Sequence, residues 1–162
     1  MKRFLAILIS VSVLAALAMA EAGARGNTLA QMEETFGVDA ETLRLALAAY
    51  MAGTAGTEAQ IANAIWLRED GTFAPDGEFL SACASFADAE VFGRAFDEGL
   101  KGEINGWIED NTDGMIKDML DSVNPAAVMY LVNAIAFDAG WEEKYEPERL
   151  REGVFNSDTG PK

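Results

Sequence analysis

The sequence of 162 residues contains no histidine and only one cysteine, Cys83. Without histidine the chain can build neither a Ser-His-Asp triad nor the common histidine-based zinc sites. A catalytic thiol would also need a histidine as its base. Cys83 lies among small residues and has no partner for an intrachain disulfide, so we predict a buried, inert thiol. These absences argue against an enzyme and predict no catalytic residue. A secreted acidic hydrolase, the enzymatic alternative, has no nucleophile and base to support it.

Basic residues are scarce as well, since 12 Lys and Arg stand against 27 Asp and Glu, which gives a formal net charge of −15. Such a chain repels phosphate backbones, so we expect no nucleic-acid partner. The charge favours solubility or a cationic partner instead. The carboxylate runs lack the alternating ligands, central glycine and closing glutamate of a calcium loop, and the sequence has no glycine-rich phosphate loop. We therefore predict no metal, cofactor or small-molecule substrate.

The N-terminal region has two competing interpretations. Two leading basic residues, an apolar run over residues 4–17 and an A-x-A sequence at residues 18–20 are typical of a secretory signal. A buried helix that is hydrophobic all round has the same composition. A transmembrane anchor is disfavoured, because Ser10 and Ser12 interrupt a run that is already at the short limit for a span. Composition alone leaves the signal peptide and the core helix open.

Hydrophobic periodicity predicts a chain of mixed helices and strands. Residues 60–68 alternate in the manner of a strand, and residues 100–111 carry one apolar helix face. Residues 128–137 are apolar enough to be covered on both faces. Thr28 and Asp39 are predicted to cap helices. The other predicted elements are a short strand over 4–9, helices over 11–22, 28–36, 39–53 and 75–86, and strands over 90–96 and 153–156.

The most specific pattern runs from Glu103 to Trp141. A helix that carries Trp107 turns over at residues 112–114, and the strand that follows is apolar throughout except for Asn133. This order and spacing resemble the serpins, a family of serine-protease inhibitors in which a helix reading INxWVxxxTxGKI precedes a strand reading LVNAIYFKGxW. The matching residues are Ile104, Asn105, Trp107, Thr112, Gly114, Ile116, Leu131 to Ile135, Phe137 and Trp141. The departures are Met115 and Asp138, where the family usually has Lys, Ala136 in place of Tyr, and Ala139 in place of Gly.

Three further segments extend the resemblance. Residues 23–32 are similar to the family's GAxGxTxxQM link, and residues 61–67 are similar to its IANALWL strand. Residues 9–19 are similar to ISPxSIxxALAM, with the proline missing. Because this last match leads directly into residue 23, it favours a core strand and helix over a cleaved signal peptide for Met1–Ala20.

The resemblance implies an α+β, serpin-like fold with helices packed on a mixed or antiparallel main sheet. Residues 1–162 would form a single partial domain that lacks the C-terminal half with the reactive loop. The resemblance also carries two groups of site residues onto this chain. The helix crossing the sheet would contribute Ile104, Asn105, Trp107, Thr112 and Gly114, and the cluster at which the sheet opens would contain Ser10, Ser12, Asn133 and Trp141.

The implied function is that of an extracellular serpin-type inhibitor whose partner is a serine protease. In this family the protease cleaves an exposed loop and forms an acyl-enzyme, and it is trapped when the loop inserts into the main sheet as a new strand. This chain would be a fragment of such an inhibitor. The alternative is a non-inhibitory or degenerate remnant with only a structural role.

Overall fold

The computed structural model describes residues 2–54, 58–140, 148, 153, 156–157 and 160–161, with side chains over 11–54 and 58–140. The helices are α1 (Lys2–Ala22), α2 (Gly26–Phe36), α3 (Ala40–Thr54), α4 (Gly77–Ala87) and α5 (Glu98–Asp110). The strands are β1 (Ala59–Arg68), β2 (Glu90–Arg94), β3 (Met129–Phe137), β4 (Asn156–Ser157) and β5 (Gly160–Pro161). The predicted edge strand over 153–156 lies mostly outside the described residues, although β4 pairs with β5 in an antiparallel turn.

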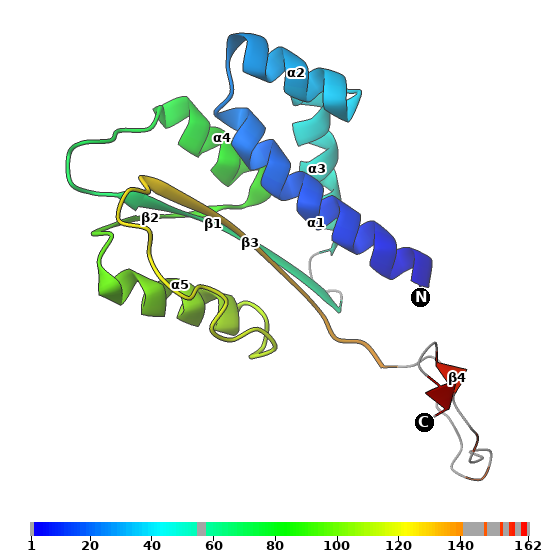
Figure 1. The fold of residues 1–162 in the computed structure, drawn as a ribbon. Coiled ribbons are helices and arrows are strands. Elements are labelled where there is room, and N and C mark those ends of the chain that lie inside the picture. Colours follow the sequence, from blue (N-terminus) through cyan, green and yellow to red (C-terminus); the bar gives the residue numbers. More distant parts are fainter. Residues whose placement is uncertain are drawn as a thin grey trace.

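The main sheet has the strand order β2-β1-β3 and is mixed, because β1 is parallel to β2 and antiparallel to β3. α1, α3 and α4 cover one face of this sheet, and α5 lies across the other (Figure 1). This is the predicted α+β arrangement. The predicted strands over 60–68 and 128–137 and the predicted helices over 75–86 and 100–111 are confirmed to within two residues at each end.

β1 is buried on both faces, and its alternating side chains divide between two apolar clusters. Ile65 and Leu67 point to the layer of α1, α3 and α4, whereas Ala64 and Trp66 point to α5. Since successive side chains of a strand face opposite sides, this division follows from the sequence once β1 is the central strand. Ala64, Ile65 and Trp66 are each 0% exposed.

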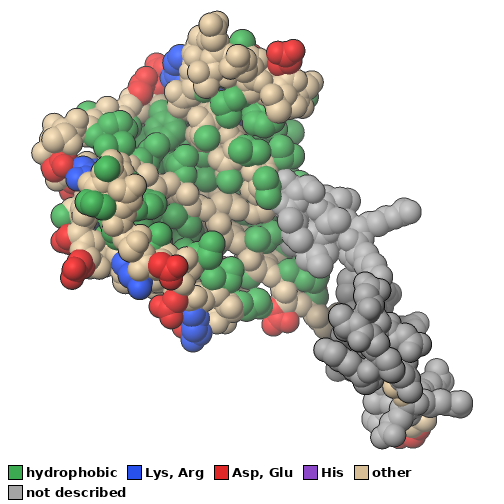
Figure 2. Space-filling view, in the orientation of Figure 1, with side chains coloured by type: hydrophobic (Ala, Val, Ile, Leu, Met, Phe, Trp, Pro, Cys, Tyr) green, Lys and Arg blue, Asp and Glu red, His purple; other side chains and the backbone are tan. Residues whose placement is uncertain are grey.

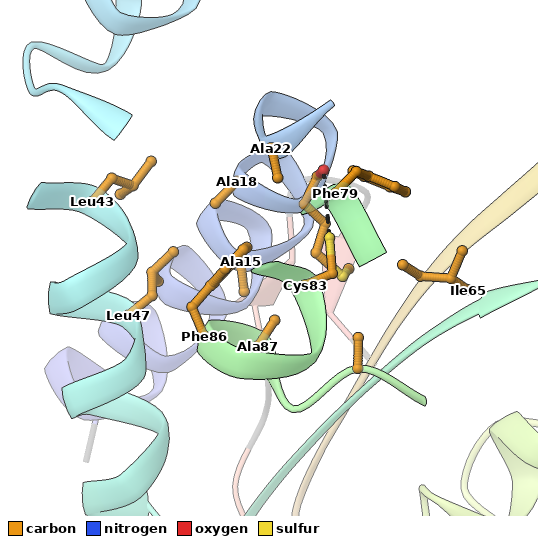
Figure 3. Close-up of a cluster of buried hydrophobic side chains, with 12 residues drawn as sticks. Ala15, Ala18, Ala22, Leu43, Leu47, Ile65, Phe79, Cys83, Phe86 and Ala87 are labelled. Carbon is orange, nitrogen blue, oxygen red and sulfur yellow. Dashed lines mark hydrogen bonds between the residues drawn. The ribbon is translucent and has the colours of Figure 1, made fainter. Parts of the chain in front are cut away.

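α1 contributes four buried apolar residues to the first cluster. They are small or flexible, namely Ala15, Ala18, Met19 and Ala22, so that the helix packs closely on β3 and beside α3 and α4. Figure 3 shows side chains of α1, α3 and α4 converging between these helices and Ile65. The predicted buried helix over 11–22 is therefore confirmed as part of a longer one.

The predicted strand over residues 4–9 is wrong, because α1 is one helix of 21 residues that begins at Lys2. The family pattern has a proline that this chain lacks, and proline removes a helix hydrogen bond and breaks the turn before it. With neither glycine nor proline between residues 4 and 17, the helix continues towards the N-terminus. In the part of the chain that the structure describes, no helix is long and apolar enough to cross a membrane.

Two predictions about helix ends have different outcomes. Asp39 caps α3 as predicted, because its carboxylate accepts a hydrogen bond of 2.8 Å from the backbone N–H of Thr42. The predicted cap at Thr28 is wrong. α2 begins at Gly26 after Arg25, whose side chain makes no capping bond, so Thr28 lies inside the first turn. The glycine's φ of 58° lets the chain turn into the helix earlier than the sequence suggested.

Cys83 is buried in α4, as predicted, and is 0% exposed. Its Sγ lies 3.9 Å from the carbonyl oxygen of Met19 on α1 (Figure 3). Burial raises the pKa of this thiol to about 11. The thiol therefore stays protonated and unreactive at neutral pH and serves as a small apolar side chain.

We expect the mature polypeptide to retain α1. Its removal would strip the helix layer of Ala15, Ala18 and Met19, each at most 1% exposed, and would leave a large cavity against β3. Intact-mass measurement and N-terminal sequencing of protein from the producing cell should give a start before residue 12. Mature protein that begins at Glu21 and shows the same circular dichroism as the full chain would contradict this.

The 162-residue chain should associate or fold only marginally when expressed alone. β3 stands at the edge of the described sheet, and Figure 2 shows hydrophobic side chains gathered across the middle of this face. A hollow of about 700 Å³ with apolar walls opens beside it, between α1, α2 and the residues Phe73 and Phe79. Open strand edges and large apolar patches favour self-association. Sedimentation velocity over a range of concentrations should show oligomers, and a sharp, reversible, concentration-independent melt of a monomer would refute this expectation.

Candidate functional site

α5 forms because its apolar residues recur at helical spacing and its first turn is capped. The carboxylate of Asp97 accepts a hydrogen bond of 2.9 Å from Gly99 N. Leu100, Ile104 and Ile108 follow at intervals of four and are all buried against β1 and β3. The predicted helix and turn, lying across a sheet that contains both 60–68 and 127–137, are confirmed (Figure 1).

Thr112 and Gly114 shape the turn that ends α5. Thr112 is 0% exposed, and its hydroxyl donates to the carbonyl of Ile108 at 2.8 Å while it accepts from Ile116 N at 3.1 Å. Gly114 has a φ of 74°, which favours glycine, and its N–H bonds to Glu109 O at 2.8 Å. These two motif residues therefore reverse the chain towards the sheet. Met115, where the family usually has Lys, is 52% exposed.

Asn105 ties the segment after the turn back to the helix. Its side-chain amide donates to the carbonyl of Leu120 at 2.9 Å and accepts from the N–H of the same residue at 2.8 Å. This pair of bonds satisfies a backbone unit outside regular structure. α5 and residues 111–123 are consequently one unit that lies over the sheet. Trp107 packs edge to face on Trp66, with ring centroids 5.5 Å apart.

A hydrogen-bonded chain of side chains crosses the other face of the sheet at Asn133. Ser12 on α1 donates to the Oδ1 of Asn133, and the Nδ2 of Asn133 donates to Asn63 Oδ1 at 2.8 Å. Asn63 in turn donates to the carbonyl of Ala87 at 2.7 Å. The antiparallel register places Asn63 directly opposite Asn133, so both amides meet inside apolar strands. The expectation that Asn133 has partners is confirmed.

The structure thus brings together Ser12 and Asn133 of the four residues carried over for the sheet-opening cluster. Ser10 belongs to α1, but its side chain lies outside the described residues, as does Trp141 entirely. The sequence analysis missed Asn63, the third member of the chain. A signal was present, because Asn63 alternates with Ile61 and Ile65 and is therefore a polar residue on a core-facing side.

Chemically, this arrangement offers neutral amides and hydroxyls rather than a reactive centre. Over the described part of the chain, no group of three or more Cys, Asp or Glu side chains is arranged to hold a metal ion. The network instead links one helix to two strands and the end of α4. A fully bonded buried network of this kind specifies how elements pack.

Comparisons with known proteins agree with this architecture. The model of the family described as "Serpin (serine protease inhibitor)" matches residues 6–162. Serpin B6 of Bos taurus is 31% identical over 158 residues, covering 90% of this chain and 42% of that protein. Serpin B9 of Homo sapiens is 32% identical over 154 residues, covering 90% and 41%. The crystal structure of the thermophilic serpin tengpin in its latent state has a TM-score of 0.85 at 40% identity, covering 93% of this chain and 42% of that one.

The fold is thus α+β and similar to that of solved serpin structures. The chain belongs to the serpin family. It spans about two fifths of the length of the curated relatives it matches.

Asn133→Ala should lower the free energy of unfolding by about 1–3 kcal/mol, because the Ser12 hydroxyl and the Asn63 carbonyl oxygen would lose their partner in a buried setting. Urea denaturation measures this change. The matched control is Ser122→Ala at an exposed site, which should change stability by less than about 0.5 kcal/mol. In Ser12→Ala/Asn133→Ala the two effects should not add, since both residues share one bond. Equal stability of Asn133→Ala and the control would rule out a stabilising network.

Proposed function

We propose that residues 1–162 form a single partial serpin domain, the front part of an inhibitor that traps a serine protease by cleavage and insertion of a reactive loop. The family resemblance assigns that loop to the C-terminal half of the relatives, beyond the portion that this chain matches. In this proposal the chain supplies the frame of the main sheet and the helix that crosses it.

The main support is that the chain resembles one relative equally well in two states. The TM-score is 0.85 against tengpin in the latent state and 0.84 against tengpin in the native state, at 40% and 39% identity. The nearly equal scores support a role for this segment as a frame against which other parts move. The elements that would form this frame are α1, α3, α4, β1 and β2, with β3 and α5 at its boundary.

We further propose that Ser12 and Asn133, with Ser10 and Trp141, belong to the cluster at which the sheet opens. The chain of bonds from Ser12 to Asn133 and Asn63 ties β3 to α1 and to its neighbour β1. Any movement of β3 relative to α1 has to break the first of these bonds. The network can therefore set how readily the sheet admits a new strand.

The partner in this proposal is a serine protease outside the cell. The extracellular location rests on the family resemblance, and since α1 packs in the core, residues 1–20 are not proposed as an export signal. Detection of the protein in the medium rather than in lysed cells is the direct measurement.

The 162-residue chain tested alone should form no covalent complex with a protease. Inhibition of this type needs an exposed loop with a strain-tolerant hinge and a sheet that accepts it, and we identify no such loop in these residues. The assay is incubation with trypsin-, chymotrypsin- and subtilisin-like proteases followed by denaturing gels. A complex that survives denaturation would contradict the expectation, because it is the trace of a trapped acyl-enzyme.

A chimera tests whether residues 1–162 support inhibition within a complete serpin. Residues 1–162 replace the matching portion of a serpin with measurable inhibitory activity, and the parent serpin is the control. The proposal expects the folded chimera to form the denaturation-resistant complex. A chimera that folds but is only cleaved as a substrate would favour a non-inhibitory remnant.

A further inference from the structure

The carboxylate of Glu103 joins three elements on the face of the sheet opposite to α1. Glu103 lies on α5, and its Oε1 accepts a hydrogen bond of 3.0 Å from the indole N–H of Trp66 on β1. Its Oε2 accepts a bond of 2.8 Å from the guanidinium of Arg94 on β2. Trp66 is 0% exposed, whereas the side chains of Glu103 and Arg94 are 36% and 44% exposed. One carboxylate therefore satisfies a buried donor with one oxygen and an accessible cation with the other.

Aromatic rings hold both donors in place. Phe92 of β2 stacks on Trp66 with ring centroids 5.0 Å apart, and the guanidinium of Arg94 lies 5.4 Å from the centre of the Phe92 ring. A second bond runs alongside, because Trp107 on α5 donates to Glu90 on β2 at 2.8 Å. These side-chain bonds all fasten α5 on the side of β1 and β2.

Over β3 the contacts of the same unit are apolar. Ile116 and Leu120, which follow α5, pack with Tyr130 and Val132 of β3. A half-open hollow of about 330 Å³, lined also by Ile104 and Ile108, runs along β3 beside them. We call α5 together with residues 111–123 the strap. Its polar anchors to β1 and β2 and its apolar side over β3 differ in kind, so the strap is suited to lift locally.

We propose that Glu103 is a positioning residue that holds the strap on the sheet, and that loss of its bond to Trp66 lets the strap open as a unit without unfolding the α1, α3 and α4 layer. In the closed state the Trp66 N–H lies in a buried site where water does not replace Glu103, whereas in the open state it is hydrated. Removing the carboxylate therefore raises the closed state in free energy and shifts the local opening equilibrium. This inference does not depend on the proposed inhibitory function.

The two hydrogen bonds of Glu103, to Trp66 and to Arg94, differ in their effect on the local opening equilibrium. An accessible ion pair such as that with Arg94 alters an equilibrium by about fivefold at most. An orphaned buried donor such as the Trp66 indole alters it by about tenfold or more. Glu103→Gln keeps an amide oxygen for Trp66 and gives up the charge facing Arg94, so it should resemble Arg94→Met. Glu103→Met, of similar length, gives up both bonds.

Hydrogen exchange of the 162-residue chain, read by mass spectrometry of peptides, tests this directly. We expect Glu103→Met to speed exchange in residues 98–123 about tenfold or more, with exchange in α1, α3 and α4 changed by less than about twofold. Glu103→Gln and Arg94→Met should change the strap by about fivefold at most. The matched control is Glu109→Gln, which removes the exposed ion pair with Lys117 from the same helix and should leave exchange close to that of the parent chain.

A double-mutant cycle separates the effect of the Glu103–Trp66 hydrogen bond from a general change in stability. In a Trp66→Phe background the buried donor is gone, so adding Glu103→Met should change strap exchange by no more than Glu103→Gln does. Hydrogen exchange that speeds up equally in the strap and in α1, α3 and α4 would overturn the proposal. A Glu103→Met effect of the same size in the Trp66→Phe background would overturn it as well. Should Glu103→Met fail to fold, Glu103→Asp, which keeps the charge but shortens the reach, carries the test. Glu103→Asp should speed hydrogen exchange in the strap and not in α1, α3 and α4. Unchanged exchange in the strap would refute the proposal.

Discussion

The burial of the middle of β1 between two helical layers is the constraint on which the other elements depend. β1 pairs with β2 over residues 64–68 and with β3 over residues 59–67, and its side chains must fill two different cores. Ile65 enters the cluster of α1, α3 and α4, while Trp66 enters the cluster of α5. Each helical layer is thus packed against the same strand, and a change in the position of β1 is transmitted to both.

Two polar arrangements occupy opposite faces of this sheet, and they differ in chemistry. On the α1 face, Asn63 and Asn133 meet across the register with Ser12, and the groups are neutral and mutually bonded. On the α5 face, Glu103 carries a charge and is partly exposed. A neutral, enclosed network responds little to salt, whereas an accessible carboxylate responds to its surroundings. The α5 face is therefore the more adjustable of the two.

The elements that were predictable from the sequence are those whose pattern is local. The alternation over 60–68 and the spacing of Leu100, Ile104 and Ile108 identified β1 and α5 without tertiary information. The strand over 4–9 was mispredicted because the family pattern contains a proline that this chain lacks. Asn63 was visible as a polar residue on a core-facing side, but its partners and those of Glu103 could not be found in this way. They depend on strand register and on which helix covers which face. The roles of Ser10 and Trp141 stay predictions.

Under the proposed function, only some residues of this chain can influence the equilibrium between a native and a latent state. The matched part of tengpin resembles the chain with nearly the same score in the native and the latent state. Contacts that are the same in two states contribute equally to both and cannot shift the equilibrium between them. Under the proposed frame, substitutions in the core of α1 and α4, such as at Met19 or Cys83, are expected to affect stability alone. Influence on the change of state belongs to contacts at the boundary of the frame, where β3 meets Ser12 on one face and the strap on the other.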